Sequence, residues 1–153
     1  MSKKKRKRRE SVAKGPWLIH YFQRHRDDDQ GRSVPARDFL EGCPVEVRAH
    51  LRAVLTAVAE APPPRFSGGL QWRAMHEDMK GYFEARDRHG TWLYRVFCLL
   101  ERNGAEVGLG GPSIVLLAGM RKPNESAFTK ADYAQVRSLG AEYMSRAPRS
   151  ILR

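Results

Sequence analysis

The pattern of apolar and charged positions predicts two strands in the second half of the chain, on which successive side chains alternate between the two faces of a sheet. The first runs from Tyr82 to Arg88, and the second runs from Trp92 to Glu101 and is apolar at almost every position except Arg95. His89–Gly90 lies between them, and a glycine that accepts positive φ is typical of a tight hairpin turn. Residues 113–118 are apolar at almost every position, which suits a strand buried on both faces in the middle of a sheet.

Charged residues interrupt this predicted sheet. Successive side chains on a strand point to opposite faces, so Glu84 and Arg86 share one face of the first strand. On the second strand, Arg95 lies on the face opposite to that of Tyr94. The cations expected on the sheet are Arg86, Arg95, Arg121 and Lys122, of which the last two directly follow the apolar strand.

The first half of the chain predicts one strand and two helices. Residues 16–22 have the aromatic and branched content of a strand. A short helix is expected over 35–41, and a longer one begins at Pro44, because the missing N–H of proline would be unpaired in the first helical turn anyway. Apolar residues at helical spacing form one stripe on the longer helix, and three prolines end it. The stripe is Leu51, Val54, Leu55 and Val58, and the prolines are residues 62–64.

Two further segments complete the predicted elements. Residues 72–79 predict either a short helix or an irregular approach to the first hairpin strand. Thr129 and Asp132 have the spacing of a capping box, which predicts the start of a last helix. That helix is expected to pack on the sheet, because it carries Tyr133, Val136, Gly140 and Tyr143 on one side.

The charge of the chain is concentrated in its first residues. The formal net charge of the 153 residues is +11, from 28 Lys and Arg against 17 Asp and Glu. Seven of these cations stand at positions 3–9, so the rest of the chain is only mildly basic. Residues 1–14 therefore predict a disordered basic tail, and residues 15–153 a single domain. Such a tail favours a polyanionic partner by sequence-independent attraction, with a solubilising or targeting role as the alternative. Its cations are Lys3, Lys4, Lys5, Arg6, Lys7, Arg8 and Arg9.

Several classes of protein lack support in the sequence. Cys43 and Cys98 have no metal-ligand spacing and are expected to be buried thiols. Asp27, Asp28 and Asp29 form an acidic run on a loop, which is more typical of solvated residues than of a metal site. No apolar run reaches the length of a membrane span, so we expect a cytoplasmic protein. The lack of a ligand pattern leads us to expect neither a metal nor a cofactor. No phosphate-binding loop, dinucleotide fingerprint or nucleophile elbow is present.

Chemistry based on the sheet cations therefore has to be considered. When an RNA 2′-hydroxyl attacks the adjacent phosphate, negative charge accumulates on the phosphorane oxygens, and fixed Arg and Lys side chains stabilise that transition state. Arg is suited to this because its planar fork can meet two oxygens at once. The alternative is that Arg86 and Arg95 only pair with Glu84 and other acids on a solvated face.

The order of these segments resembles that of the RelE/ParE/HigB superfamily of toxins from type II toxin–antitoxin systems, and in particular its phage-derived branch. The resemblance covers residues 16–146. Its most specific parts are Glu84-Ala-Arg86, Tyr94-Arg95-Val96 and the Arg121–Lys122 pair after the apolar strand. It implies a RelE-like α+β fold, in which two N-terminal helices and a C-terminal helix pack on a twisted antiparallel sheet.

The resemblance also implies a function. It implies a metal-independent mRNA endoribonuclease, often acting on the ribosome, that arrests growth and is neutralised by a cognate antitoxin, expected to be a helix-turn-helix protein. Arg86, Arg95 and Lys122 would then bind the phosphate and stabilise the transition state, with Arg121 a weaker candidate. Lys80, Tyr82 and the basic tail would contact RNA.

The general acid of such a reaction is left open. Family members often have a histidine in the segment that is 118–120 here, and a Tyr or His near the C-terminus, and this sequence has neither. The candidates that it offers are His76, Tyr82, His89 and Tyr94. Two other functions therefore stay open: a non-catalytic RNA- or ribosome-binding protein, and a toxin directed at gyrase.

Overall fold

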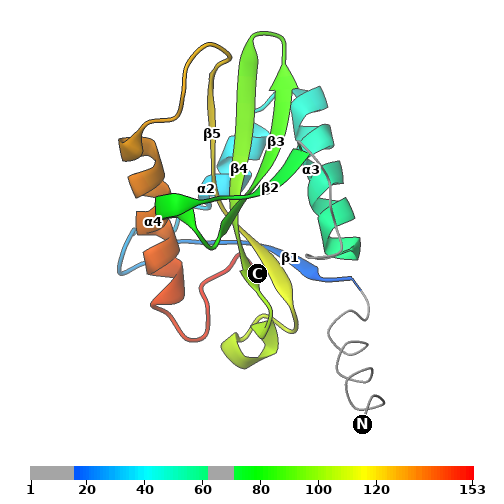
Figure 1. Ribbon diagram of the computed structural model, residues 1–153. Helices are drawn as coiled ribbons and strands as arrows, with labels where there is room; N and C mark the ends of the chain where they lie inside the picture. The colour runs from blue at the N-terminus through cyan, green and yellow to red at the C-terminus, as the bar shows by residue number, and fades with distance from the viewer. Residues whose placement is uncertain (1–15, 62–70) are drawn as a thin grey trace.

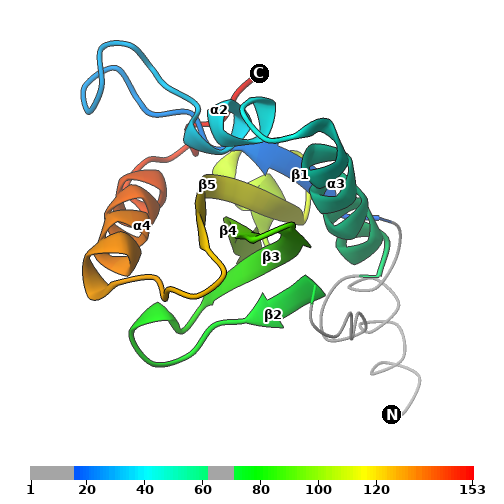
Figure 2. The ribbon, with the colours of Figure 1, turned by 90° about the horizontal axis from the view of Figure 1, so that it is seen from above.

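The chain folds around a mixed sheet with helices on both faces. The computed structural model describes residues 16–61 and 71–153. Within them, five strands follow the order β1-β5-β4-β3-β2 (Figure 1). Helices α2 and α3 cover one face and α4 lies against the other, as the view from above shows (Figure 2). The α+β class implied by the resemblance is confirmed. The elements are β1 Leu18–Tyr21, α2 Pro35–Glu41, α3 Val45–Glu60, β2 Trp72–Ala74, β3 Tyr82–His89, β4 Trp92–Glu101, β5 Ser113–Pro123 and α4 Lys130–Met144, with short 3₁₀ helices η2 Glu77–Met79 and η3 Gly104–Val107.

The predicted hairpin of β3 and β4 is present, but its turn lies one residue later. His89 pairs with Trp92, so the two loop residues are Gly90 and Thr91. Gly90 has a φ of +60°, the conformation that favours glycine at the first loop position of a type II′ turn. The shift extends β3 to His89, because the strand continues until a residue can adopt positive φ.

The apolar segment is the buried strand that the sequence predicts. Residues 113–118 of β5 are all buried, and β5 lies between β4 and β1. The expected antiparallel sheet is only partly correct, because β1 pairs with β5 in parallel. Helices α2 and α3 follow β1 and cross one face of the sheet before β2 begins. Because this connection is long, β1 can run parallel to β5.

The first face is covered by the predicted helical stripe. Leu51, Val54, Leu55 and Val58 are buried, in one cluster with Ala85 and Val96 from the sheet. Pro44 is the N-cap, so α3 begins one residue after the expected start. The helix ends at Glu60, and the prolines that were expected to stop it lie outside the described residues.

Residues 72–79 form an edge strand followed by a 3₁₀ turn, neither of which the periodicity resolved. Trp72 pairs with Ala85 of β3, and its ring stacks on Phe83 at a centroid distance of 5.3 Å and an interplanar angle of 11°. The strand is only three residues long, too short for a period to be visible. The aromatic stack with β3 is the tertiary contact that holds it extended.

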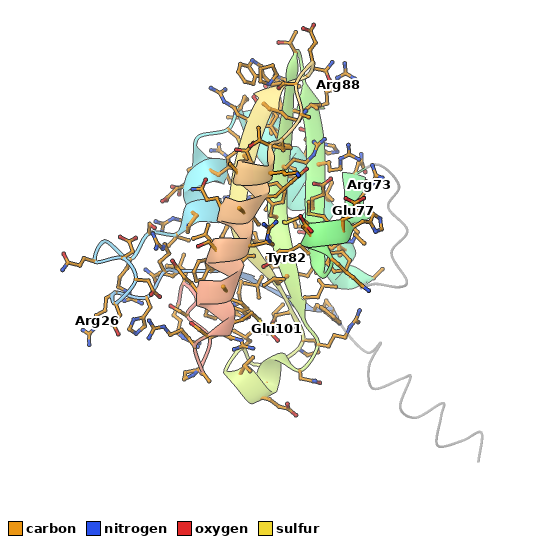
Figure 3. The ribbon with its side chains drawn as sticks, turned by 60° about the vertical axis from the view of Figure 1, so that its left-hand side comes forward. Arg26, Arg73, Glu77, Tyr82, Arg88 and Glu101 are labelled. Carbon is orange, nitrogen blue, oxygen red and sulfur yellow. The ribbon has the colours of Figure 1, made fainter. Side chains whose placement is uncertain are left out.

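The second face is covered by α4 over part of its length. The predicted capping box is present, since Thr129 and Asp132 each accept a hydrogen bond from the other's backbone N–H. Val136, Gly140 and Tyr143 are buried against the sheet. The tip of the hairpin extends beyond the helix, with Arg88 at its end (Figure 3). The surface of β3 and β4 near the tip is therefore not covered by α4.

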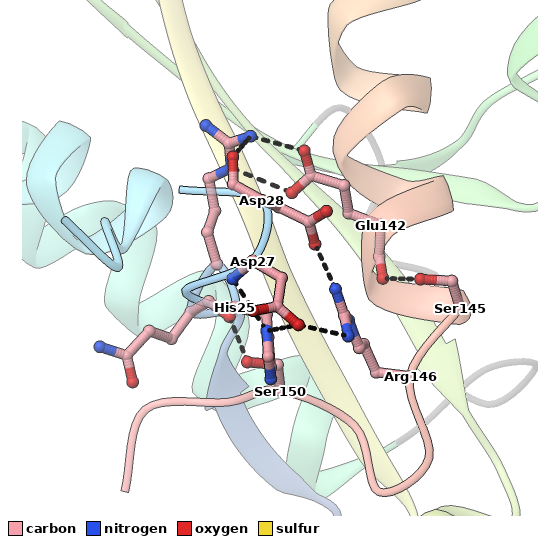
Figure 4. A network of polar contacts seen from close by, with 9 residues as sticks. His25, Asp27, Asp28, Glu142, Ser145, Arg146 and Ser150 are labelled. Carbon is pink, nitrogen blue, oxygen red and sulfur yellow. Dashed lines mark hydrogen bonds and ion pairs between the residues drawn. The ribbon is translucent and has the colours of Figure 1, made fainter. Parts of the chain in front are cut away.

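The C-terminal end of α4 is tied to the first loop by ion pairs. Arg24 donates to both carboxylate oxygens of Glu142, at 3.0 and 2.6 Å. Arg146 bonds Asp28 at 3.1 Å and lies 3.7 Å from Asp27 (Figure 4). The acidic run of this loop therefore has a structural role in orienting α4, and it is not merely solvated.

Cys43 and Cys98 are buried free thiols, as expected. Burial raises the pKa of both, most of all for Cys98, which lies within the sheet. Among residues 16–61 and 71–153, none of the helices is long and apolar enough to cross a membrane.

Close packing between α4 and β3 gives a stability prediction. A Cβ on Gly140 would collide with the hydroxyl of Tyr82. Gly140→Ala should therefore lower the free energy of unfolding by about 1 kcal/mol, because an overpacking loss of roughly 1–3 kcal/mol exceeds the roughly 0.5–1 kcal/mol that alanine gains over glycine within a helix. Urea denaturation measures this, with Gly42→Ala as the control, because a Cβ there meets only ordinary contacts at 3.5 Å.

The contact between Gly140 and Tyr82 also predicts the stability of a double variant. In a Tyr82→Ala background the methyl group added at position 140 has room, so it should cause little further loss. An equal loss from Gly140→Ala in both backgrounds would contradict the assigned contact.

Candidate functional site: a cation cluster on the hairpin

Three cations lie on the uncovered part of the α4 face, and we call Arg86, Arg95 and Lys122 the cation cluster. Arg86 and Arg95 are directly opposite each other across β3 and β4. Lys122 of β5 pairs with Leu93, two residues before Arg95 on the same face. The strand register thus brings together three of the four cations that the sequence placed on the sheet.

Arg95 is held firmly in this cluster. Only 6% of the residue is exposed, which is unusual for an arginine. Its Nη1 donates to the carbonyl oxygen of Tyr94 at 3.0 Å, and its guanidinium lies 6.0 Å from the centre of the Phe128 ring. The strand backbone and the aromatic ring together hold the side chain in place, so its charge is oriented before any ligand binds.

Among the described residues, Glu84 is the carboxylate within ion-pair distance of both arginines. Its Oε1 lies 3.5 Å from Nε of Arg86 and 3.7 Å from Nε of Arg95. The ion-pair alternative considered from the sequence is therefore present in the structure. One carboxylate does not balance three cations, however. In addition, the buried Nη1 of Arg86 has no hydrogen-bond partner among the described residues.

The excess charge and the burial lower the pKa values of two of the cations. The pKa of Arg95 is lowered by burial first and by Arg86 second, against a raising effect of Glu84. The pKa of Lys122 is lowered by burial, then by Arg95 and Arg86. The cluster therefore holds positive charges in a place that disfavours them, and an anion would relieve this.

The cluster opens into a cleft of about 420 Å³ at the hairpin, which we call the hairpin cleft. Its walls include all of the following residues: His50, Gln71, Arg86, Asp87, Arg88, Leu93, Arg95 and Asn124. His50 was not identified from the sequence. Its Nδ1 lies 2.6 Å from an oxygen of Asp87, and no local pattern joins a residue of α3 to one of β3.

The remaining predicted site residues lie elsewhere. Arg121 is on the opposite face, with its guanidinium 4.4 Å from the centre of the Trp92 ring, so it does not join the cluster. Tyr82 is packed under α4, where burial raises its pKa. Lys80 is exposed after η2. The basic tail, from Lys3 to Arg9, lies outside the described residues.

The candidates for a general acid are also dispersed. Tyr94 is buried on the α2–α3 face, and His89 is exposed at the hairpin turn. His76 lines a different cleft, between η2 and α4. Among these candidates, none lies in the walls of the hairpin cleft, whereas His50 does. Among the described residues, no group of three or more His, Cys, Asp or Glu side chains could hold a metal ion.

Two aromatic residues next to the cluster, Phe128 and Tyr133, were not assigned a role in the site from the sequence. Their ring centres are 6.1 Å apart, and both rings meet Phe97 edge-on. Phe128 directly precedes the N-cap Thr129, and Tyr133 is the fourth residue of α4. This spacing is that of a hydrophobic staple, so the capping box was a signal that pointed to this contact.

Comparisons with known proteins add little at the level of sequence. A scan against protein-family models and a search of curated proteins find no match. Among solved structures, the chain is similar to one from the RelBE2 toxin–antitoxin complex of Mycobacterium tuberculosis, with 16% identity and a TM-score of 0.41. The match covers 70% of this chain and 99% of that chain. At this level of similarity, function has to be inferred from the geometry of the site itself.

The lowered pKa of Lys122 gives a stability prediction whose sign is defined. The folded state binds this proton less tightly than the unfolded chain does, where the usual value is 10.5. At neutral pH the charged Lys122 side chain therefore lowers the free energy of unfolding. This unfavourable contribution disappears as the pH increases from the lowered pKa toward 10.5. Lys122→Met should raise the thermal midpoint at neutral pH and low salt, and should abolish this dependence on pH.

Lys80→Met is the matched control, because it removes an exposed lysine outside the cluster and should change neither quantity. Added sulfate should raise the midpoint of the wild type more than that of Lys122→Met. A lower midpoint for Lys122→Met would mean that its contacts with the Ser126 carbonyl oxygen and the Phe128 ring outweigh the repulsion.

Proposed function

We propose that this protein is the toxin of a type II toxin–antitoxin system and cleaves RNA at the cation cluster. The observation that carries the proposal is the pairing of Arg86 with Arg95, with Lys122 beside them and one carboxylate to balance three cations. Such an excess of oriented positive charge favours a phosphate ligand. The resemblance of the same segments to RelE- and HigB-type toxins supports RNA as the source of that phosphate.

The proposed reaction is attack of a 2′-hydroxyl on the adjacent phosphorus. The oxygen–phosphorus bond forms as the 2′-hydroxyl loses its proton, for which the Glu84 carboxylate beside both arginines is the acceptor. The bond to the 5′-oxygen breaks, and that oxygen takes up a proton. His50, which lines the hairpin cleft together with Arg86 and Arg95, is the proposed donor of that proton. The products are a 2′,3′-cyclic phosphate and a 5′-hydroxyl.

The arginines contribute most where charge develops. The phosphorane carries more negative charge on its oxygens than the starting diester does, so fixed guanidiniums lower the barrier. Arg95 suits this role because it is buried, bonded to the backbone and flanked by Phe128. Charge stabilisation by these side chains requires no metal ion, and we expect cleavage to continue in the presence of a chelator.

The proposal includes partners. The domain from residue 15 to 153 would act on mRNA in the cytoplasm, and the tail of residues 1–14 would add attraction to RNA or to the ribosome. A cognate antitoxin, expected to be a helix-turn-helix protein, would neutralise the toxin. Arg121 is left out of the proposed catalytic group because it lies on the opposite face.

Expression without a partner should arrest growth, and sequencing of RNA ends after induction tests the proposal directly. Cuts within translated codons, with 5′-hydroxyl ends, are the expected result. Growth arrest with intact RNA and damaged DNA would instead indicate a toxin directed at gyrase. RNA or ribosome binding without cuts would indicate the non-catalytic alternative. Unimpaired growth with abundant soluble protein would contradict a toxin of any kind.

Arg95→Ala should slow cleavage by about 10²–10³, equivalent to roughly 2.7–4 kcal/mol, the effect of removing one oriented donor from a transition-state site. Arg95→Lys should restore only part of the rate, because an ammonium keeps the charge and loses the planar fork. The measurement is single-turnover cleavage of a short RNA, with the thermal midpoint of each variant determined in parallel.

Arg121→Ala is the matched control, because it removes an arginine from the adjacent strand on the other face. It should cleave at the wild-type rate. Wild-type activity in a folded Arg95→Ala protein would remove Arg95 from the site. A large drop in its thermal midpoint, with an unchanged rate, would favour the purely structural ion pair with Glu84.

A further inference from the structure

A second and larger cleft adjoins the cation cluster. It has a volume of about 750 Å³ and lies between β2–η2 and the first turns of α4, and we call it the α4–β2 cleft. Figure 3 shows Arg73 and Glu77 together on this side of the molecule. Glu84 and Phe128 line the α4–β2 cleft and also contact the cation cluster. The two sites are therefore continuous.

The charge of the α4–β2 cleft differs from that of the cluster. Three cations and three acids stand in its walls, which are Arg73, Lys130 and Arg137 against Glu77, Asp78 and Glu84. Because Glu84 also pairs with Arg86 and Arg95, the cleft keeps one unbalanced cation, fewer than the two of the cation cluster. A neutral ligand with hydrogen-bonding edges suits these walls better, because it can meet donors and acceptors alike.

The apolar walls of the cleft are aromatic and thioether groups. Phe128 and Tyr133 both line it, and both are only partly buried. The edges of the two rings rest on Phe97, at centroid distances of 6.0 and 6.2 Å and interplanar angles of 79° and 88°. These contacts fix the rings and leave part of their surface exposed. Met75 and Met79 add adaptable apolar surface nearby.

We propose that the α4–β2 cleft binds the base of a nucleotide next to the cleaved phosphate in single-stranded RNA. The proposal rests on the proposed function, because it takes the phosphate to be at the cation cluster. A planar base offers a π-face to Tyr133 and hydrogen-bonding edges to Arg73 and Glu77. The shared position of Glu84 and Phe128 places the base and its phosphate in adjoining parts of one surface.

This arrangement assigns different tasks to the two clefts. The hairpin cleft and its cations take the charged backbone and the reacting atoms. The α4–β2 cleft holds one base and so determines which phosphate reaches Arg95. Tyr133 acts here as a substrate-binding residue, and it needs to carry no charge to do so. Burial and the neighbouring Glu84 raise the pKa of its phenol, which keeps the ring neutral.

Binding of uncleavable RNA tests the base site separately from cleavage. The probes are short 2′-O-methyl oligoribonucleotides, which lack the attacking hydroxyl, with one base at a time replaced by an abasic unit. In the wild type, one position should lose affinity by roughly 5- to 150-fold when its base is absent, the range expected for a stacked base. Fluorescence anisotropy at fixed ionic strength provides the measurement.

Variants of Tyr133 test whether the α4–β2 cleft is the site that binds the base. Tyr133→Leu keeps apolar volume without an aromatic face, so intact and abasic probes should bind it equally. Tyr133→Phe should keep the wild-type difference. Trp92→Leu is the matched control, because it removes an aromatic residue of the hairpin from the opposite face, and it too should keep the difference. Cross-linking from 4-thiouridine at the sensitive position should label Phe128, Tyr133 or Met75.

The outcomes separate this inference from the proposed function. Arg95→Ala should weaken binding of intact and abasic probes by the same factor. If Arg95→Ala weakens binding but no abasic position weakens binding to the wild type, the base site is refuted and the phosphate site stands. If neither Arg95→Ala nor the removal of any base affects binding, both sites are refuted. If Tyr133→Leu proves unstable, the wild-type scan, Tyr133→Phe and the cross-link still decide, and a cross-link outside the cleft refutes the inference.

Discussion

The direct pairing of Arg86 with Arg95 across β3 and β4 is the constraint on which the site depends. Like charges directly opposite each other on a sheet are destabilising. The register is nevertheless fixed, because the same pairing places Ala85 and Val96 in the core under α2 and α3. A slip of one residue would expose that apolar face. The buried side of the hairpin therefore holds the two arginines together on its other side.

The environment of these arginines shows how their charge is maintained. Glu84 offsets part of the repulsion, and the Tyr94 carbonyl oxygen and the Phe128 ring orient Arg95. What is left is a lowered pKa for Arg95 and for Lys122, and a buried N–H of Arg86 without a partner among the described residues. A surface arranged only for stability would not keep these features, and functional sites often do.

Helix α4 determines which part of this sheet surface is exposed. Its N-terminal staple places Phe128 and Tyr133 beside the cluster, and its C-terminal end is held by Arg24 and Arg146. Because the helix stops short of the hairpin tip, it covers the apolar part of the sheet and leaves the charged part open. The position of one helix thus determines both the aromatic cleft and access to the cations.

The sequence by itself determined the features that depend on local period and capping. It predicted the β3–β4 hairpin, the faces of Arg86 and Arg95 on their strands, the buried strand β5, the stripe of α3 and the capping box of α4. Each of these is encoded within about ten residues, because strand and helix repeats are short. The turn and the start of α3 were each misplaced by one residue, since such ends depend on backbone detail.

Only the tertiary structure decided how these parts meet. Alternation shows that Arg121 and Lys122 face opposite ways, but the β4–β5 register decides that Lys122 is the one beside Arg95. The parallel pairing of β1, the short edge strand β2 and the approach of His50 to Asp87 join segments far apart in the chain. No local period records such contacts, because they form only when separate apolar faces are buried against each other.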